Sequence, residues 1–104
     1  MLILPIKKKW FDMIKSGEKK EEYREIKPYY DTRFRGYYYP TTGMQPHILF
    51  RNGYSKNSPT IECKVCITKG TGKQEWGAEP NKEYYILDIL EVHKWFVLKK
   101  KEKE

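Results

Sequence analysis

The chain has 104 residues, of which 38% are hydrophobic and 15% aromatic, and it carries a formal net charge of +7. This length suits one domain and leaves no room for a second independent core. The opening apolar stretch, residues 1–6, is too short for a membrane span or a signal sequence, so we expect a cytoplasmic protein without membrane contact.

Positive charge is distributed over the body of the chain. Residues 99–104 contain four lysines and two glutamates, so a net charge of +5 remains on residues 1–98. We expect 1–98 to form a single domain and 99–104 to be a charged C-terminal tail. A basic domain with a sequence pI near 9.3 favours polyanionic partners, because binding neutralises phosphates and releases their counterions. The simpler alternative is a charge that only aids solubility.

The first two predicted elements are a short buried strand near 2–6 and a helix over about 7–16. Spacings of three and four bring several apolar residues to one helix face, namely Trp10, Met13 and Ile14. Gly17 then supplies the left-handed position that ends the helix. The run Lys7-Lys8-Lys9 is unfavourable for the dipole at a helix start, which hints at phosphate contacts, although a solvated face is the default interpretation.

Residues 19–26 are too polar for the core, and their composition alone would also allow a helix. A turn into an exposed strand is favoured, because a helix rarely restarts directly after a capping glycine. In a strand, Glu22 and Arg24 share one face, and Glu21 and Tyr23 share the other.

The rest of the chain predicts mainly strands. Three prolines and two glycines exclude a long regular element from residues 28–46. Strands are expected near 47–51, 60–68 and 83–92, the last being apolar on both faces and therefore central. Residues 95–98 extend that strand or dock as a short terminal segment. This order predicts an α+β fold, a small curled β-barrel with one main N-terminal helix.

Residues 17–24 carry the most informative pattern, Gly-Glu-Lys-Lys-Glu-Glu-Tyr-Arg, which fits G-x-K-x-x-E-x-R. This pattern resembles the signature of the ASCH domain family, and the layout of elements over residues 2–92 agrees with it. The resemblance implies a PUA-like fold and an association with RNA. The fixed positions fall on Gly17, Lys19, Glu22 and Arg24.

Physical chemistry gives these positions distinct roles. Lys19 follows the turn and is expected to place its ammonium at the mouth of a cleft. Glu22 can fix the guanidinium of Arg24, which then presents a planar fork to a phosphate or a base edge. The alternative is an ordinary ion-pair cluster on a charged strand.

A second function follows from the same resemblance. Some small bacterial ASCH proteins are amidohydrolases that remove the acyl group from N(4)-acetylcytidine with a lysine, a threonine and a glutamate. The lysine corresponds to Lys19, whereas Glu22 occupies the threonine position and could act only as a general base for water. Glu75 and Glu79 are candidates for the glutamate. If the chain is such a hydrolase, the catalytic residues are expected to be Lys19, Glu22 and Glu75.

Aromatic residues and arginines alternate in residues 28–40, which suits base stacking at roughly 1–3 kcal/mol per base together with phosphate contact. We expect Arg33 and Arg35 to bind ligand, because a small core has no need of them, while the tyrosines are divided between binding and packing. Trp76 either caps a base in the cleft or anchors its loop. Anchoring is favoured, because tryptophan is costly to leave in water.

Cys63 and Cys66 form a C-x-x-C motif, but strand positions three apart point to opposite faces and cannot chelate one metal. His47 and His93 do not follow zinc-finger spacing. We therefore expect no metal and no cofactor. The sequence predicts an RNA- or nucleotide-binding module. The alternatives are a hydrolase of acylated cytidine-type nucleosides and a protein-interaction module that uses the tyrosine-rich segment.

Overall fold

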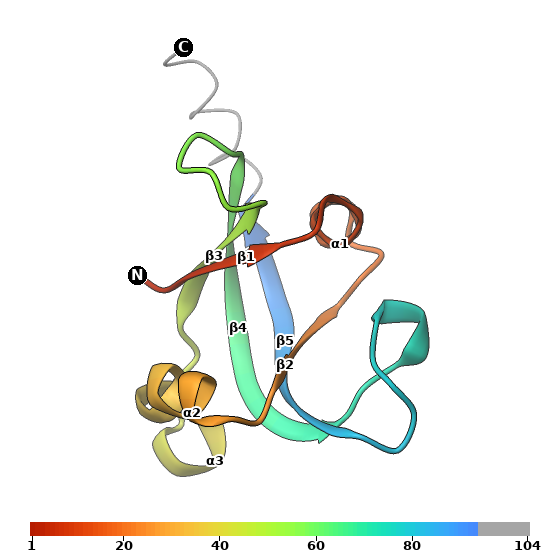
Figure 1. The fold of residues 1–104 in the computed structure, drawn as a ribbon. Helices are drawn as coiled ribbons and strands as arrows, with labels where there is room; N and C mark the ends of the chain where they lie inside the picture. Colours follow the sequence, from red (N-terminus) through yellow and green to blue (C-terminus); the bar gives the residue numbers. More distant parts are fainter. Residues whose placement is uncertain (94–104) are drawn as a thin grey trace.

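Five strands form one mixed sheet in the computed structural model, which describes residues 1–93 (Figure 1). In spatial order they are β1 Ile3–Ile6, β3 His47–Asn52, β4 Thr60–Thr71, β5 Glu83–His93 and β2 Glu21–Glu25. β1 runs parallel to β3, and all other neighbouring pairs are antiparallel. The α+β class and the five expected strands are confirmed. The expected extension at 95–98 and the tail at 99–104 lie outside the described residues.

The sheet does not close into the barrel that the sequence predicted, because its edge strands β1 and β2 form no backbone ladder with each other. A side chain joins these edges instead. Arg24 on β2 donates from NH2 to the carbonyl of Pro5 on β1 at 2.9 Å. β1 also carries a proline, which has no N–H to offer a ladder. The two edges therefore approach each other while leaving a gap in the sheet.

The main helix is α1, Lys8–Ser16, close to the predicted bounds, and it packs against β3 and β5. It ends at Gly17, whose φ of 88° is left-handed and whose N–H donates to the carbonyl of Ile14 at 3.1 Å. Phe11 and Ile14 are its buried residues, whereas Met13 is only half-buried. Phe11, rather than the expected Met13, therefore joins the core.

Three short helices follow β2, which agrees with the expectation of no long regular element in 28–46. They are α2 Pro28–Phe34, η1 Arg35–Tyr37 and α3 Tyr39–Thr42, and Figure 1 shows α2 and α3 together, well away from α1. Phe34 anchors this region, because it is fully buried and its ring meets that of Tyr85 edge-on at 5.0 Å. Within residues 1–93, no helix has the length and apolar character needed to cross a membrane.

The core lies on one face of β3, β4 and β5. The alternation predicted for β4 is confirmed, since its inward residues are fully buried, namely Ile61, Cys63, Val65 and Ile67. The central position predicted for β5 is also confirmed, because residues 84–87 are all buried and the strand lies between β4 and β2.

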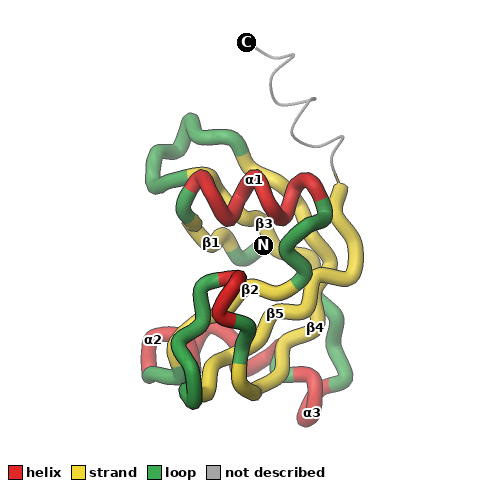
Figure 2. Tube along the Cα trace, turned by 90° about the vertical axis from the view of Figure 1, so that its right-hand side faces the viewer, coloured by secondary structure: helices red, strands yellow, loops and turns green. Residues whose placement is uncertain are grey.

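The loop at 72–82, which contains the short helix η2 (Gln74–Trp76), stands in front of the sheet and beneath α1 (Figure 2). The N–H of Lys73 donates to the hydroxyl of Tyr23 on β2 at 2.9 Å. A Cβ at Gly72 would lie 2.7 Å from the ring of Tyr23 and 2.7 Å from the Cβ of Ala78. Only glycine fits where the loop crosses this tyrosine.

The Gly72→Ala substitution is expected to lower the free energy of unfolding by roughly 1–3 kcal/mol, because the new methyl group overpacks the contact with Tyr23. Urea denaturation followed by circular dichroism measures this change. Gly36→Ala is the matched control, since a Cβ at Gly36 would meet nothing within 4 Å. Equal losses in the two variants would contradict the proposed crowding at Gly72.

Candidate functional site

Glu22 and Arg24 share one face of β2, as the sequence predicted. They pair across the ladder with Leu87 and Tyr85 of β5, two buried core residues. Polar side chains at the edge of a sheet are thereby directed toward the core side of the molecule. Such groups are stable there only when their charges and hydrogen bonds are satisfied.

A single carboxylate forms ion pairs with two cations at this position. One oxygen of Glu22 (Oε1) lies 3.3 Å from Nζ of Lys19, and the other (Oε2) lies 2.8 Å from NH2 of Arg24. Lys19 is 1% exposed and Glu22 is 7% exposed. The three side chains form one buried network with a net charge of +1, which we call the signature network.

The ammonium of Lys19 does not stand at a cleft mouth, contrary to the expectation from sequence. It donates to the carbonyl of Trp76 at 2.8 Å and lies 4.8 Å and 4.9 Å from the ring centroids of Trp10 and Tyr23. Burial lowers the pKa of Lys19, and the attraction of Glu22 opposes this shift only in part. The turn after Gly17 directs the side chain inward, where it holds the 72–82 loop against the sheet.

Arg24 joins three elements. Besides its bonds to Glu22 and to Pro5 on β1, its NH1 donates to the hydroxyl of Tyr30 on α2 at 3.0 Å. Burial lowers the pKa of Arg24, but Glu22 and Tyr30 outweigh that effect and raise the pKa above its ordinary value. The buried Nε of Arg24 has no hydrogen-bond partner in the part of the chain that the structure describes. The guanidinium is therefore a fixed cation whose Nε–H donor is unused.

A cleft of about 380 Å³ lies beside this network, at the gap between β1 and β2. Its size is within the range of small-ligand sites, about 300–1,000 Å³. Glu22 and Arg24 line it together with Pro5 and Ile6 of β1. Basic and aromatic side chains complete the wall, namely Lys7, Lys8, Lys27, Trp10, Tyr23, Tyr30, Tyr54 and Tyr84.

The structure separates the other predicted site residues from this cleft. Arg33 and Arg35 are exposed and do not line it, and the guanidinium of Arg33 lies 3.4 Å from the ring centroid of Tyr29 instead. Glu75 is exposed and also does not line the cleft. Trp76 is 9% exposed, so the interpretation of it as a loop anchor is confirmed, and it contributes its carbonyl to Lys19.

Several residues that line the cleft were not predicted from the sequence as site residues. The sequence predicts Trp10 only as part of a helix face, and it assigns no individual role to Tyr30 or Pro5. The signal that could have found Tyr30 was its place in the segment where rings alternate with arginines. For Pro5 and Trp10 no local signal exists, because their roles depend on the approach of β1 and α1 to β2.

The two cysteines behave as their spacing predicted. Cys63 faces the core, and burial raises the pKa of its thiol to about 12. Cys66 lies half-buried, three positions further along the same strand, and both cysteines are free. They form neither a chelating pair nor a disulfide.

Comparisons with known proteins return no match, whether with family models, with curated proteins or with solved structures. The resemblance of residues 17–24 to the ASCH signature therefore stays a prediction. What the chain does must be inferred from the geometry of the network and the cleft.

Glu22→Gln is expected to lower the free energy of unfolding by roughly 3 kcal/mol, because it leaves Lys19 and Arg24 buried without a counter-charge. Urea denaturation of wild type and variant measures the loss. The control is Glu25→Gln on the same strand, whose carboxylate is exposed and lies 3.8 Å from Lys27 and 3.6 Å from Lys82. That change is expected to stay within about 0.5 kcal/mol. Similar values for both variants would mean that the signature network is not a stabilising feature.

Proposed function

We propose that the protein is an RNA- or nucleotide-binding module of the ASCH type, with a PUA-like fold. The observation that carries the proposal is a cleft with a fixed arginine at its base and lysines and aromatic rings on its walls. A nucleotide combines an anionic phosphate with a flat aromatic base, and such a wall offers a partner to both.

The charge of the cleft supports an anionic ligand. Four basic residues line it, Lys7, Lys8, Arg24 and Lys27, against the acidic residues Glu22 and Glu25. Glu22 is already engaged by Lys19 and Arg24, so it repels an incoming phosphate less than an isolated carboxylate would. Lysine supplies mobile point charges for phosphate, and arginine supplies a fixed fork.

The rings of the cleft support a ligand that carries a base. Tyr54 is 87% exposed at the cleft, so the faces of its ring are open to a flat ligand. Trp10, Tyr30 and Tyr84 lie deeper in the wall and are at least half-buried. Stacking on such rings contributes about 1–3 kcal/mol per base and tolerates any base, so the proposal includes no base preference.

The assignment to the ASCH type is supported by the way the four signature residues lie together in the fold. Gly17 ends α1 and turns the chain, and Lys19, Glu22 and Arg24 form one connected network beside the cleft. A surface ion-pair cluster, the simpler alternative, would not bury a lysine to 1% exposure. The PUA-like part is supported by the order of elements and by a sheet whose edges approach each other through Arg24 and Pro5.

The proposal predicts that Lys7→Ala combined with Lys27→Ala weakens binding of a short single-stranded RNA by roughly tenfold at low salt. The logarithmic salt slope is expected to become less steep by about 1.4, since each phosphate contact with a single strand contributes about 0.7. Fluorescence polarisation with a labelled RNA pool at several salt concentrations measures both quantities.

The charge-matched control is Arg33→Ala combined with Arg35→Ala, which removes two positive charges outside the cleft. It is expected to leave most of the affinity intact. If this pair causes the larger loss, the binding surface is on α2 and η1 rather than at the cleft. If wild type binds neither RNA nor mononucleotides at low salt, the proposal is wrong.

Hydrolysis of N(4)-acylated cytidine is the second candidate, and the lowered pKa of Lys19 is the observation that favours it, since such shifts are typical of catalytic groups. The location of Lys19 opposes it, because the residue is buried and does not line the cleft. We expect N(4)-acetylcytidine to remain intact after long incubation with concentrated protein, as chromatography of the nucleosides would detect. Acyl release that Lys19→Met abolishes would instead support the hydrolase.

A further inference from the structure

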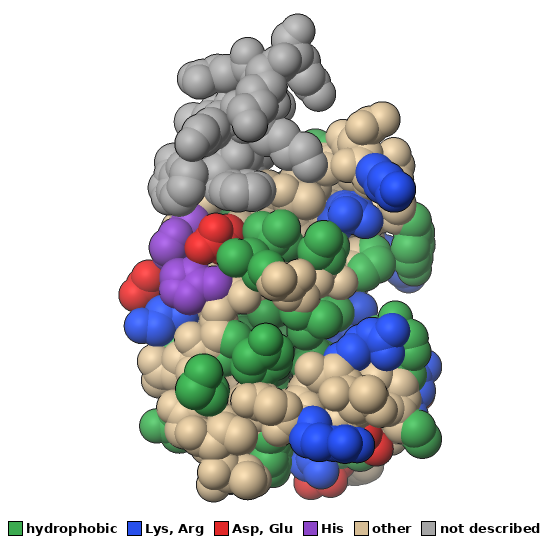
Figure 3. All heavy atoms as spheres, turned by 90° about the vertical axis from the view of Figure 1, so that its left-hand side faces the viewer, with side chains coloured by type: hydrophobic (Ala, Val, Ile, Leu, Met, Phe, Trp, Pro, Cys, Tyr) green, Lys and Arg blue, Asp and Glu red, His purple; other side chains and the backbone are tan. Residues whose placement is uncertain are grey.

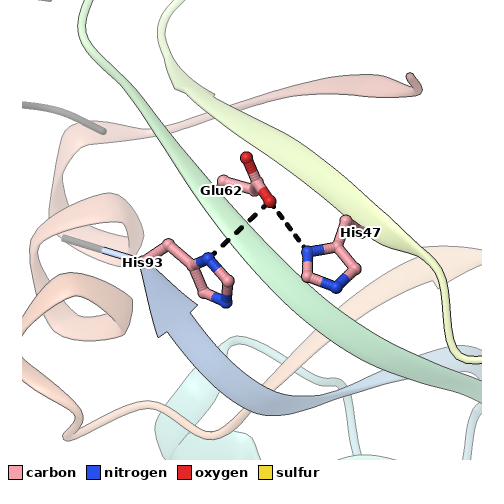
Figure 4. A group of neighbouring side chains, drawn as sticks. All are labelled: His47, Glu62 and His93. Carbon is pink, nitrogen blue, oxygen red and sulfur yellow. Dashed lines mark hydrogen bonds and ion pairs between the residues drawn. The ribbon is translucent and has the colours of Figure 1, made fainter. Parts of the chain in front are cut away.

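Two histidines and a glutamate from three neighbouring strands meet on the sheet face that points away from the core. They are His47 on β3, Glu62 on β4 and His93 at the end of β5 (Figure 4). Figure 3 shows the two histidines together at the surface with acidic side chains beside them. We propose that these three residues bind a divalent transition-metal ion, through Nδ1 of each histidine and Oε2 of Glu62.

The strand register brings the three residues together. Glu62 lies directly opposite His93 in the β4–β5 ladder. His47 lies opposite Lys64, which is two residues from Glu62 and on the same face of β4. His93 is thus the directly opposite neighbour of Glu62 and His47 is a diagonal neighbour, all on one face. An imidazole side chain can reach Glu62 from either position.

A β-bulge in β5 places the side chain of His93 on this face of the sheet. Lys64 pairs with Glu91, but the next residue of β4, Val65, pairs with Ile89, so Leu90 is an additional residue in β5. Without the bulge, strict alternation would place His93 on the same face as the core residue Leu87. Bulges frequently redirect a side chain next to a functional site. The bulge at Leu90 thus immediately precedes Glu91 in the longest ladder of the sheet and sets the face on which Glu91 and His93 lie.

The two distances to Glu62 lie within an ångström of those expected in a tetrahedral metal site. Nδ1 of His47 is 2.8 Å from Oε2 of Glu62, and Nδ1 of His93 is 3.7 Å from the same oxygen. All candidate ligand atoms lie within 4.8 Å of one another. Metal–ligand bonds of about 2.0–2.1 Å in a tetrahedron separate ligand atoms by roughly 3.3 Å, a value between the two measured distances.

Glu91 supplies the hydrogen bond that orients one of the ligands. Its Oε1 lies 3.1 Å from Nε2 of His93, on the ring side opposite Nδ1. A carboxylate that accepts the Nε2 proton fixes the tautomer whose Nδ1 lone pair faces Glu62. Histidine ligands of metals almost always have such a partner. Lys64 in turn lies 3.7 Å from the other oxygen of Glu91 and positions it.

The ligand set also indicates the class of ion. Two imidazoles and one carboxylate suit zinc, cobalt, nickel or copper ions, whereas calcium and magnesium prefer oxygen ligands alone. The side chains of His47, Glu62 and His93 are 38%, 15% and 24% exposed, so an ion bound there stays accessible to water. Three protein ligands leave a coordination position for a water molecule.

Isothermal titration calorimetry of the full, untagged chain with Zn²⁺ tests the site, together with the absorption spectrum of the Co²⁺ form. We expect one ion per chain and a cobalt spectrum without a thiolate charge-transfer band. His47→Gln and Glu62→Gln are each expected to weaken zinc binding by more than about 100-fold, and Glu91→Gln by about tenfold, since outer hydrogen-bond partners contribute 10–100-fold. Cys66→Ser and Glu83→Gln are controls that should bind like wild type.

Circular dichroism of the metal-free variants establishes whether they fold. If a ligand variant does not fold, Glu91→Gln and the wild-type cobalt spectrum decide the question. Wild type that binds no zinc, ligand variants that bind it equally well, or a loss confined to Cys66→Ser would each overturn the proposal. The titration contains no RNA, so its outcome is independent of the function proposed for the cleft.

Discussion

The structure depends on one carboxylate that pairs with a buried lysine and a largely buried arginine. Moving an ammonium or guanidinium out of water costs several kcal/mol, and only a counter-charge with good geometry offsets that cost. Glu22 supplies this for both Lys19 and Arg24. Because these two cations are held in place, Lys19 can bind the carbonyl of Trp76 in the 72–82 loop, and Arg24 can reach Pro5 on β1 and Tyr30 on α2. Three segments, the 72–82 loop, β1 and α2, thus meet at a five-residue edge strand.

The same network explains why a cleft exists where a barrel would otherwise close. β1 and β2 are the edges of the sheet, and a side-chain bond from Arg24, not a backbone ladder, spans the distance between them. An unpaired edge exposes backbone donors and acceptors and invites association with other chains. Here the edges face each other across a cleft with charged walls, so they are shielded from lateral pairing but remain open to a small ligand.

Local patterns in the sequence predicted the parts of the fold that depend on local physics. The spacing of apolar residues indicated α1, Gly17 marked its end, and strict alternation indicated β4. The burial of Lys19 could not be predicted, because its main acceptor is the carbonyl of a residue 57 positions away. The cluster of His47, Glu62 and His93 could not be predicted either. Strand register and a one-residue bulge, not sequence spacing, bring its residues together. Arg33 and Arg35 have the right chemistry for a ligand, but residue type alone does not reveal that they lie away from the cleft.

β5 runs past both proposed sites, the cleft and the histidine cluster. Before the bulge, Tyr85 and Leu87 face the core beside Arg24 and Glu22, and after the bulge Glu91 and His93 face the opposite side. The carboxylates of Glu62 and Glu91 consequently lie on the far side of the sheet from the lysines of the cleft. In a chain whose net charge is +7, this arrangement keeps two carboxylates away from the cleft, where they would repel the anionic ligand proposed for it. A metal ion bound between the histidines would partly cancel the negative charge on the other face, so the two proposed sites would influence each other through the electrostatic field even though they share no residue.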